Sequence, residues 1–545
     1  MTEKTRRQFL HAVGVAGGAG VLYGTMGALG LSPAAQAAPP YHPPTRADFN
    51  LTGRSAKSVI ILGGGVAGLA SAYELRKAGY KVRILEARTR PGGRSWTIRR
   101  GTTETDLNGN TQQARFADGQ YMNPGPARIA QHMVTLDYCR ELDVPIEVFA
   151  NQNAHGYYYR ENSGPLSNKL IRHREAKADT YGYVSELLAK ATDQGSLDKY
   201  LTGDDKERLL AFLRNFGDLG DRVANDPAAS WKYTGSARRG FVVDPGAGQQ
   251  AGTRTTAAAL SDVLASGIGH HFSFEFGFEQ AMLMFQPVGG MDRIPYALER
   301  AIGRRVITYG VEVTSITNTP AGVDVVYTDA EGRPQQASAD FCICTIPPQI
   351  LKRIPANFSQ PVKDALAYAT PVNTGKIGLQ YNRRWWEEDD KIYGGITNTN
   401  VGLAPGDDLL GSGSTIWYPS HGFHSRRGIV IGYYNFGETA AQMGALSPAE
   451  REARALADGV KVHGEKYRQH LETSFSVAWN RTRHSEGGWV AWPTRTSGHY
   501  DRLLVPEGNT YFAGDHLTYL VAWQAGAFES ARKVVSDLHS RVMSG

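Results

Sequence analysis

The 545-residue sequence predicts an α/β fold that combines a Rossmann-like GxGxxG domain with an α+β domain and a helical domain. Residues 59–62 form an apolar run, as expected for a short strand buried on both faces. The turn Gly63-x-Gly65-x-x-Gly68 follows at once. A helix is then predicted over residues 66–78. This order of strand, glycine turn and helix is typical of a dinucleotide-binding unit.

Each glycine of the turn has a separate role. Gly63 allows the chain to leave the strand sharply, Gly65 lets a pyrophosphate approach the backbone, and Gly68 lets the helix pack closely on the sheet. Val66 and Ala67 begin the helix. Their N–H groups have no partner within the helix, so together with the positive end of the helix dipole they favour a bound phosphate.

A second strand follows and ends in Glu86, at the usual distance for a hydrogen bond to a ribose hydroxyl. A carboxylate at this position repels a 2′-phosphate and therefore disfavours NADP. The next segment, RPGGRS, carries Gly93 and Arg94. A domain that binds NAD has no need of this segment.

Composition and charge exclude several classes of protein. The charged fraction of 21% and the hydrophobic fraction of 41% are those of an ordinary soluble folded protein. The net charge of +6 includes +2 from residues 1–37 and otherwise shows no long basic run, so no nucleic-acid partner is expected. The three cysteines, Cys139, Cys342 and Cys344, have neither metal-binding nor disulfide spacing, and no metal site is predicted. The last two alternate in an apolar strand pattern and are interpreted as core residues.

Residues 1–37 are predicted to be a twin-arginine-type signal peptide. Arg6 and Arg7 precede an uncharged stretch over residues 12–31, and Ala35-Gln36-Ala37 fits a cleavage site. A membrane anchor is the alternative, because about 20 apolar residues can span a bilayer. Seven residues of the stretch are glycines, however, which makes it a weak anchor. We therefore expect no stable membrane anchor and an exported protein, either periplasmic or secreted.

Four motifs occur in an order shared with one known group of enzymes. They are GGGVAGLASAYEL, RPGGRS, PVGGMDRIPYAL and TYFAGDHLTYLVAWQAGAFESA. On these motifs the chain resembles the flavin amine oxidase superfamily, and within it the FAD-dependent L-amino acid oxidases, over nearly all of the mature length. The resemblance implies FAD as the cofactor. We expect the FAD to be noncovalent, because no cysteine follows Cys344 to form the cysteinyl flavin link of some monoamine oxidases.

The resemblance implies that the first, second and fourth motifs meet in one flavin site. In the family's arrangement Arg94 meets the phosphates and Asp515 binds the ribityl or pyrophosphate part. The backbone of Val313 contacts adenine. The residues expected to contact FAD are Gly63, Gly65, Val66, Ala67, Gly68, Glu86, Ala87, Arg88, Gly93, Arg94, Pro126, Ala127, Arg128, Val313, Trp479, Gly514, Asp515, Ala522 and Trp523.

The motifs and the local periodicity also suggest how the mature chain divides. The segment after residue 150 is polar, with apolar spacings of three and four that predict helices. The expected divisions are an FAD-binding domain of residues 53–115, 285–370 and 500–545, a substrate-binding domain of residues 38–52, 116–160 and 371–499, and a mainly helical domain of residues 161–284.

The L-amino acid part of the resemblance depends on fewer residues. Arg128, in NPGPARI, matches an arginine that binds the substrate carboxylate, to which a guanidinium offers two parallel N–H donors. A structural salt bridge at a helix start is the alternative for Arg128. Tyr433 matches a tyrosine whose hydroxyl group donates a hydrogen bond to the same carboxylate. The alternative for Tyr433 is a strand tyrosine whose hydroxyl group is solvated. Ala522-Trp523 stands where the family has Gly-Trp, whose backbone carbonyl holds the substrate amine, so the alanine is a departure.

Lys376 matches a lysine that holds a water against flavin N5. Ile377 and Leu379 alternate beside it, which puts Lys376 on the opposite face of a strand, and a solvated lysine at a strand start is the alternative. Trp479 and Trp489 match flavin-facing and side-chain-pocket positions, and Trp489 replaces what is often a smaller residue.

The end of the helical region contains two weaker signals. Four phenylalanines alternate over residues 272–278, which favours a strand packed into the core over an aromatic wall beside a substrate. A histidine of the family's helical region has no secure counterpart, and His270 and His271 are the nearest.

The resemblance implies oxidative deamination of L-amino acids, mainly large apolar or aromatic ones. The products are 2-oxo acids, ammonia and hydrogen peroxide, with O2 as the second substrate, and a homodimer is expected. The alternatives are an L-amino acid 2-monooxygenase, a monoamine or polyamine oxidase, and a non-catalytic flavin-binding protein. The expected catalytic residues are Lys376, Arg128 and Tyr433, and the expected substrate-binding residues are Arg128, Tyr433, Ala522, Trp523 and Trp489.

Overall fold

The structure is a computed structural model that describes residues 40–545 except 270, 273–276, 282 and 408–413. The predicted signal peptide therefore lies outside the described residues. His270 does too, and so does most of the phenylalanine alternation at residues 272–278.

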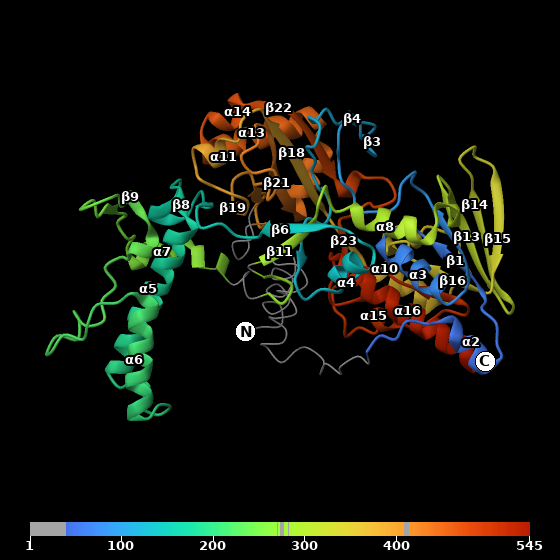
Figure 1. The fold of residues 1–545 in the computed structure, drawn as a ribbon, viewed down its shortest axis with the longest axis horizontal. Coiled ribbons are helices and arrows are strands. Elements are labelled where there is room, and N and C mark those ends of the chain that lie inside the picture. The colour runs from blue at the N-terminus through green and yellow to red at the C-terminus, as the bar shows by residue number, and fades with distance from the viewer. Residues whose placement is uncertain (1–39, 270, 273–276, 282, 408–413) are drawn as a thin grey trace.

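A parallel five-stranded sheet forms the centre of one layer of the molecule, and Figure 1 labels two of its strands, β1 (Ser58–Leu62) and β16 (Phe341–Cys344). Every neighbouring pair in it is parallel, so the predicted α/β, Rossmann-like fold is confirmed. The strand that precedes the glycine turn is central, and four of its five residues are buried. In sheet order the strands are β12 (Ile307–Tyr309), β2 (Lys81–Glu86), β1 (Ser58–Leu62), β16 (Phe341–Cys344) and β24 (Thr510–Phe512).

Helices pack on one face of this sheet and a small antiparallel sheet on the other. On the helical side, α3 (Val66–Lys77) lies between α8 (Arg293–Ile302) and α16 (Gln524–Ser544), and together they enclose the first hydrophobic core. The second core lies beneath β13 (Glu312–Thr319), β14 (Gly322–Thr328) and β15 (Pro334–Ala339), with α10 (Gln360–Tyr368) and α15 (His499–Leu504). Cys342 and Cys344 belong to this second core, as predicted.

A mixed seven-stranded sheet forms the other layer. Its strand β18 is buried along its whole length, because core side chains cover one face and the other face adjoins the first layer. In sheet order the strands are β22 (Leu471–Ala478), β18 (Thr374–Tyr381), β21 (Gly428–Phe436), β20 (Ser414–Trp417), β19 (Ile396–Thr399), β7 (Tyr157–Tyr159) and β8 (Ile171–Arg172).

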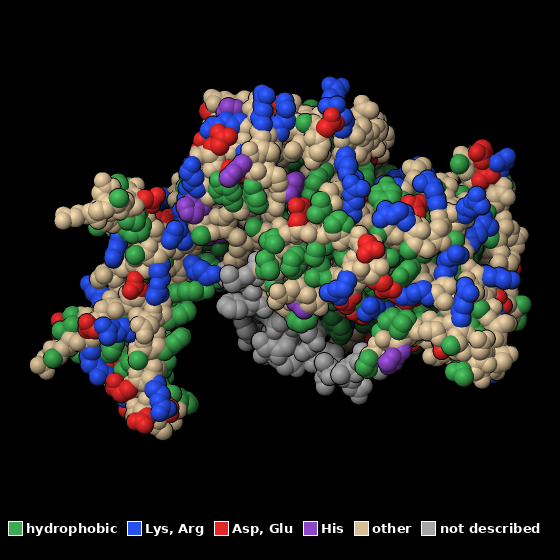
Figure 2. Space-filling model, viewed as in Figure 1, with side chains coloured by type: hydrophobic (Ala, Val, Ile, Leu, Met, Phe, Trp, Pro, Cys, Tyr) green, Lys and Arg blue, Asp and Glu red, His purple; other side chains and the backbone are tan. Residues whose placement is uncertain are grey.

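A helical arm extends from the body of the molecule (Figure 1). It consists mainly of α5 (His173–Asp193) packed along α6 (Gly203–Gly217), with α7 (Leu260–Ser266) beside them. Figure 2 shows hydrophobic side chains along the arm, and on the same face Lys and Arg side chains are interspersed with acidic ones.

Shorter elements connect these layers. The remaining helices are α2 (Arg46–Thr52), α4 (Val134–Glu141), α9 (Pro348–Leu351), α11 (Trp385–Glu388), α12 (Gly437–Ala445), α13 (Pro448–His463) and α14 (Lys466–Gln469). The remaining strands are β3 (Thr103–Thr105), β4 (Thr111–Gln113), β5 (Ile129–Ala130), β6 (Ile146–Ala150), β9 (Phe241–Val243), β10 (Thr253–Arg254), β11 (Leu283–Pro287), β17 (Thr370–Val372) and β23 (Trp489–Ala491). Within the described residues, no helix combines the length and the hydropathy that crossing a bilayer requires.

Candidate functional site

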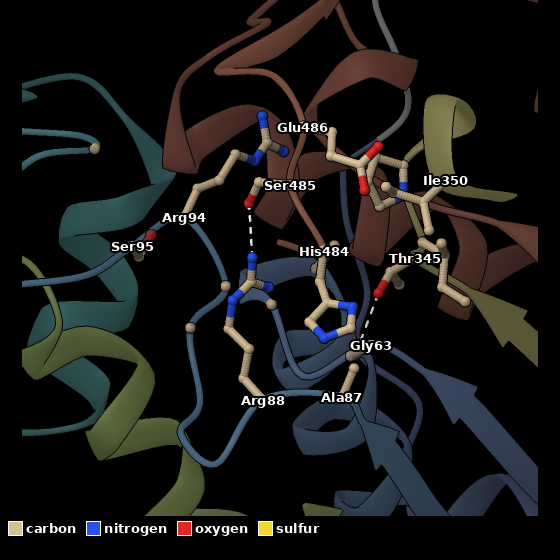
Figure 3. Close-up of a pocket in the computed structure, with 18 of the residues that line it drawn as sticks. Gly63, Ala87, Arg88, Arg94, Ser95, Thr345, Ile350, His484, Ser485 and Glu486 are labelled. Carbon is tan, nitrogen blue, oxygen red and sulfur yellow. Dashed lines mark hydrogen bonds between the residues drawn. The ribbon is translucent and has the colours of Figure 1, made fainter. Parts of the chain in front are cut away.

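A cavity of about 620 Å³ lies where the central strands end. Gly63 follows β1, Ala87 follows β2 and Thr345 follows β16, and all three line it (Figure 3). Gly514, just after β24, lines it too. Ligands of open α/β sheets bind at the carboxyl ends of the strands, so this is the expected position for a dinucleotide.

The glycine turn has the geometry that its predicted roles require. Gly63 has φ +104°, which a residue with a side chain rarely adopts. A Cβ on Gly68 would lie 2.0 Å from the Gly63 carbonyl oxygen, so only glycine permits this approach of α3 to β1. A Cβ on Gly65 would meet no protein atom within 4 Å and would occupy space next to the cavity. Gly68 supports the turn from behind and is not part of the cavity wall, whereas Val66 and Ala67 are.

Glu86 is buried at the end of β2, beside the turn. Its carboxylate accepts hydrogen bonds from the backbone N–H groups of Gly64, at 2.6 Å, and Arg88, at 2.7 Å. These bonds fix the acid at the edge of the cavity, where it was predicted to meet a ribose.

Arg94 and Asp515 form an ion pair across the cavity wall. Burial raises the pKa of the Asp515 carboxyl, but Arg94 and His516 more than offset this, and the pKa lies below its ordinary value. Asp515 also accepts a hydrogen bond from Ala522 N–H at 3.0 Å, and Arg94 donates one to the Gly488 carbonyl at 2.7 Å. The second and fourth sequence motifs therefore meet the first, as the resemblance implied.

The cavity residues fit FAD. The start of α3 offers N–H groups to phosphates, Glu86 lies at the ribose position, and Trp479 and Trp489 provide flat apolar walls. Gln524 Oε1, in the same wall, is buried and has no hydrogen-bond partner among the described residues. A buried acceptor of this kind is costly unless a ligand donor reaches it.

Arg128 lies beside the aromatic end of the cavity. Its guanidinium carbon is 4.7 Å from the ring centroid of Trp417 and 5.4 Å from that of Trp523. Gln280 Oε1 accepts a hydrogen bond from its Nη2 at 3.4 Å. Burial lowers the pKa of Arg128 to about 10, so the group is still a cation at neutral pH. This site combines a positive charge with aromatic walls.

Three predicted FAD contacts do not line the cavity, and Gly68 is one of them. Ala127 and Arg128 do not line the cofactor cavity either, whereas Pro126 and Trp523 do line it. Ala127 packs against the first hydrophobic core instead. Arg128 lies over the ring of Trp523, a lining residue, and is therefore next to the cavity without lining it.

Lys376 is buried in β18, with 3% of its surface exposed. Its Nζ donates hydrogen bonds to the carbonyls of Gly125, at 2.6 Å, and Asn123, at 3.3 Å. Burial, and secondarily Arg128, lower the pKa of Lys376 to about 7. Ile377 lies in the third core, on the other face, so the predicted orientation of Lys376 is confirmed and a solvated lysine is ruled out.

Tyr433, predicted to bind the substrate carboxylate, does not line the cavity. Tyr433 is opposite Ile377 in the antiparallel pair of β18 and β21, and its side chain packs in the third core with Ile377. Tyr434 is opposite Lys376, and the Lys376 Nζ lies 4.3 Å from the Tyr434 ring centroid. Because side chains alternate along a strand, only one of the two tyrosines can face the cavity, and it is Tyr434.

The remaining predicted residues lie around the cavity. Trp479 is 2% exposed and donates from Nε1 to the Pro124 carbonyl at 2.9 Å. Trp489 and Val313 contribute to the same wall. Ala522 adopts φ +69°, the left-handed conformation for which the family's glycine is suited. Gly93, with φ +55°, Ala87, Arg88 and Trp523 also line the cavity.

His271 packs away from this site. Its ring centroid is 4.7 Å from that of Tyr158, at the junction with the helical arm, and it does not line the cavity. The structure thus gives His271 no contact with the cofactor site.

Sequence reasoning missed Tyr434, Trp417 and Gln280. The alternation in GIVIGYYNF contained the signal for Tyr434, because pairing with the β18 pattern would have set the register. Trp417 and Gln280 come from β20 and from the loop before β11. No local pattern links either of them to Arg128.

Fold and cavity together define an FAD-type dinucleotide site beside a cationic, aromatic pocket. The chain matches the family described as flavin containing amine oxidoreductase over residues 66–539. It therefore belongs to that family: it is a flavoprotein oxidoreductase whose cofactor is FAD.

Individual relatives are distant. The L-amino-acid oxidase BmooLAAO-I of Bothrops moojeni is 25% identical, with 90% of each chain covered. YobN of Bacillus subtilis is 24% identical, covering 89% of this chain and 95% of its own. Among solved structures, cyclohexylamine oxidase from Brevibacterium oxydans superposes with a TM-score of 0.58 at 17% sequence identity, and the match covers 89% of this chain and 99% of that one. A putrescine oxidase variant superposes with a TM-score of 0.57 at 18% sequence identity, with the same coverage of both chains.

Proposed function

We propose that the protein is an L-amino acid oxidase, which converts an L-amino acid, O2 and water into a 2-oxo acid, ammonia and hydrogen peroxide. The observation that carries the proposal is Arg128, a cation held between Trp417 and Trp523 at the aromatic end of the cavity. The names of the curated relatives agree with it.

Arg128 binds the substrate carboxylate in this proposal. A guanidinium fits a carboxylate with two parallel hydrogen bonds, and each charge-assisted bond contributes about 1.5–3 kcal/mol. Tyr434 takes the part first assigned to Tyr433 and donates its hydroxyl to the same carboxylate. Two anchors of this kind orient the Cα–H bond of one enantiomer toward the cofactor.

Aromatic side chains surround the substrate amine. Trp479, Trp523 and Tyr434 give it a poorly solvating environment, which favours the neutral amine over the ammonium. FAD held in this cavity would supply the two-electron acceptor for the hydride from Cα–H. Lys376, with a pKa of about 7 produced by burial and by Arg128, holds or passes on a proton near neutral pH.

The side-chain preference is part of the proposal. Trp489 lies 5.6 Å, centroid to centroid, from Phe436, and it lines the cavity where a smaller residue is frequent in the family. An aromatic wall favours large apolar or aromatic L-amino acids.

An amine oxidase is the second candidate, because the solved structures that superpose on this chain bear the names of amine oxidases. An enzyme for simple amines would not need a cation at the aromatic end of its cavity. An L-amino acid 2-monooxygenase would need Arg128 but would release an amide and carbon dioxide.

One experiment separates these candidates. Purified holoenzyme is assayed for peroxide with L-amino acids, D-amino acids and the matching decarboxylated amines, and product masses are measured. We expect peroxide and 2-oxo acids from L-amino acids only. Arg128→Met should lower kcat/KM for amino acids at least about 100-fold, from the loss of two charge-assisted bonds, and for amines far less. Equal losses on both substrate classes would refute the carboxylate role.

We also propose that residues 1–37 direct export through a twin-arginine pathway. The proposal is supported by the Arg6-Arg7 pair and the glycine-rich stretch that follows. Replacing both arginines by lysine should retain the protein in the cytoplasm, and unchanged export would contradict it. The expected homodimer is a further prediction, which light scattering of the purified protein tests.

A further inference from the structure

One stretch of the cavity wall comes from the layer of the seven-stranded sheet, here named the substrate-binding layer. Charged side chains tie it to the layer of the five-stranded sheet, here named the cofactor-binding layer. The stretch is the segment of residues 482–488, between β22 and β23, here named the clamp segment. Arg483 and Gly488 of this segment line the cavity. So do His484, Ser485 and Glu486, which Figure 3 labels.

The clamp segment is also part of the molecular surface. The Arg483 side chain is 65% exposed and that of Glu486 23% exposed. A residue that lines a cavity and also faces solvent belongs to its outer wall. FAD in this cavity would therefore be separated from solvent by the clamp segment on that side.

Two ion pairs fasten the outer wall to the cofactor-binding layer. Arg353, just after α9, forms two bonds with the Glu486 carboxylate, of 2.7 and 2.8 Å. Arg483 reaches Glu312 of β13 at 2.8 Å, and His484 lies 3.4 Å from the same carboxylate. Glu312 and Arg353 also line the cavity, so both pairs lie at its edge.

Hydrogen bonds to uncharged acceptors hold the same segment on both sides. Arg88 Nη2 donates to the Ser485 hydroxyl and to the Arg483 carbonyl, both at 2.8 Å, and Gln349 donates to the Ser485 carbonyl at 2.7 Å. Gly487 N–H is bonded to the Trp479 carbonyl at 2.9 Å, which ties the segment to the substrate-binding layer.

The backbone of the segment is held in an unfavourable conformation. His484 has φ +63° and Glu486 has φ +48°, although neither is glycine. Left-handed non-glycine residues persist where the surroundings over-determine them, and here the surroundings are the two ion pairs and the Arg88 bonds. Loss of those contacts would let the segment relax away from the cavity.

We propose that the clamp segment retains FAD, and that the pairs Arg353–Glu486 and Arg483–Glu312 set the rate at which FAD leaves. The residues of these pairs are positioning residues, since they act through the backbone of residues 482–488. The proposal concerns cofactor retention and does not depend on which substrate the enzyme oxidises.

The test measures FAD release from the holoenzyme. Released flavin is followed by its fluorescence while an excess of an unrelated apoflavoprotein captures it. Glu486→Gln and Glu312→Gln should each speed release by about two- to fivefold, as expected for partly exposed ion pairs. Raising the salt concentration from 0.05 to 1 M should speed FAD release from the unaltered enzyme, because salt screens exposed charges. The same change should speed release much less in the variant that combines Glu486→Gln with Glu312→Gln.

Matched variants separate retention from general damage. Glu472→Gln breaks a comparable bidentate pair, Arg427–Glu472, that does not line the cavity, and it should leave the release rate unchanged. The charge exchange Arg353→Glu with Glu486→Arg should restore slow release, and the melting temperature of the apoprotein should stay within about 2 °C in every variant. Three outcomes would each overturn the proposal. The first is an unchanged rate of FAD release in Glu486→Gln and Glu312→Gln, and the second is an equally faster release in Glu472→Gln. The third is a charge exchange that fails to restore slow release.

Discussion

Replacing Tyr434 by phenylalanine removes one hydroxyl group from the aromatic end of the cavity and leaves its walls in place. The ring that lies 4.3 Å from Lys376 Nζ is kept, and so is the contribution of Tyr434 to the cavity lining. The change therefore isolates the proposed hydrogen bond between the Tyr434 hydroxyl and the substrate carboxylate.

The size of the effect follows from the charge of the acceptor. A hydrogen bond to a charged group contributes about 1.5–3 kcal/mol. Since about 1.4 kcal/mol corresponds to a factor of ten, kcat/KM for L-amino acids should fall roughly 10- to 150-fold. The decarboxylated amines have no carboxylate, and their kcat/KM should change less than about threefold.

Tyr433→Phe is the matched control, because Tyr433 is the neighbouring residue and points into the third core. It should change the free energy of unfolding by about 1 kcal/mol or less and leave kcat/KM within about twofold. Peroxide-coupled steady-state kinetics on both variants, with denaturant unfolding alongside, completes the comparison. If Tyr433→Phe proved as damaging to kcat/KM as Tyr434→Phe, the strand register inferred for the site would be wrong.

Three further predictions concern the fold around the site. Burial and Arg128 lower the pKa of Lys376 to about 7, below its ordinary value of 10.5, so between these pH values the unfolded chain binds a proton that the folded protein has released. The free energy of apoprotein unfolding should therefore rise with pH from about 7 to 10.5, and Lys376 should contribute up to about 1.4 kcal/mol per pH unit to this rise. Denaturant titrations of Lys376→Met should show that this contribution is lost. An equal slope in the variant and in the unaltered protein would contradict the lowered pKa of Lys376. Ala522→Gly relieves a left-handed alanine and should raise apoprotein stability by about 1 kcal/mol; a lower melting temperature would show that the methyl group packs favourably. Gly68→Ala places a Cβ 2.0 Å from the Gly63 oxygen and should destabilise the apoprotein by about 1–3 kcal/mol. Gly65→Ala should leave apoprotein stability nearly unchanged but weaken FAD binding in fluorescence titrations. The reverse pattern would contradict the roles assigned to the two glycines.

The part of the cofactor site formed by the glycine turn could be predicted from local sequence, because its determinants are close together in the chain. The residues from β1 to Glu86 form one continuous unit, in which the turn, the helix start and the terminal acid are fixed by local conformation. The predicted helix of residues 66–78 matches α3 within one residue at its end. The late helix α16 begins at Gln524, because Ala522 is left-handed and Trp523 caps the helix.

The substrate end of the site was harder to predict because its residues come from separate strands and loops. Tyr433 and Tyr434 are chemically identical in sequence, and the pairing of β21 with β18 determines which of them faces Lys376. A β-bulge between Ile377 and Gly378 shifts the pairing register locally, and the sequence of a single strand does not indicate such a bulge. Motif matching therefore selected the tyrosine that packs in the core, whereas its neighbour Tyr434 lines the cavity.

The clamp segment was not anticipated, although its residues are among the most polar of the chain. Arg353, Glu312 and Glu486 are distant in sequence, and nothing in their local surroundings pairs them.

The amino-acid sequence alone was sufficient for the Rossmann-like unit, because short-range geometry specifies it. FAD, and Arg128 as a candidate site residue, followed from the resemblance of the sequence motifs to a known family. The face on which Tyr434 lies, the aromatic contacts of Arg128, the lowered pKa of Lys376 and the ion pairs of the clamp segment depend on the folded structure. Strand register and burial are properties of chain segments packed together, and neither is encoded within a single segment.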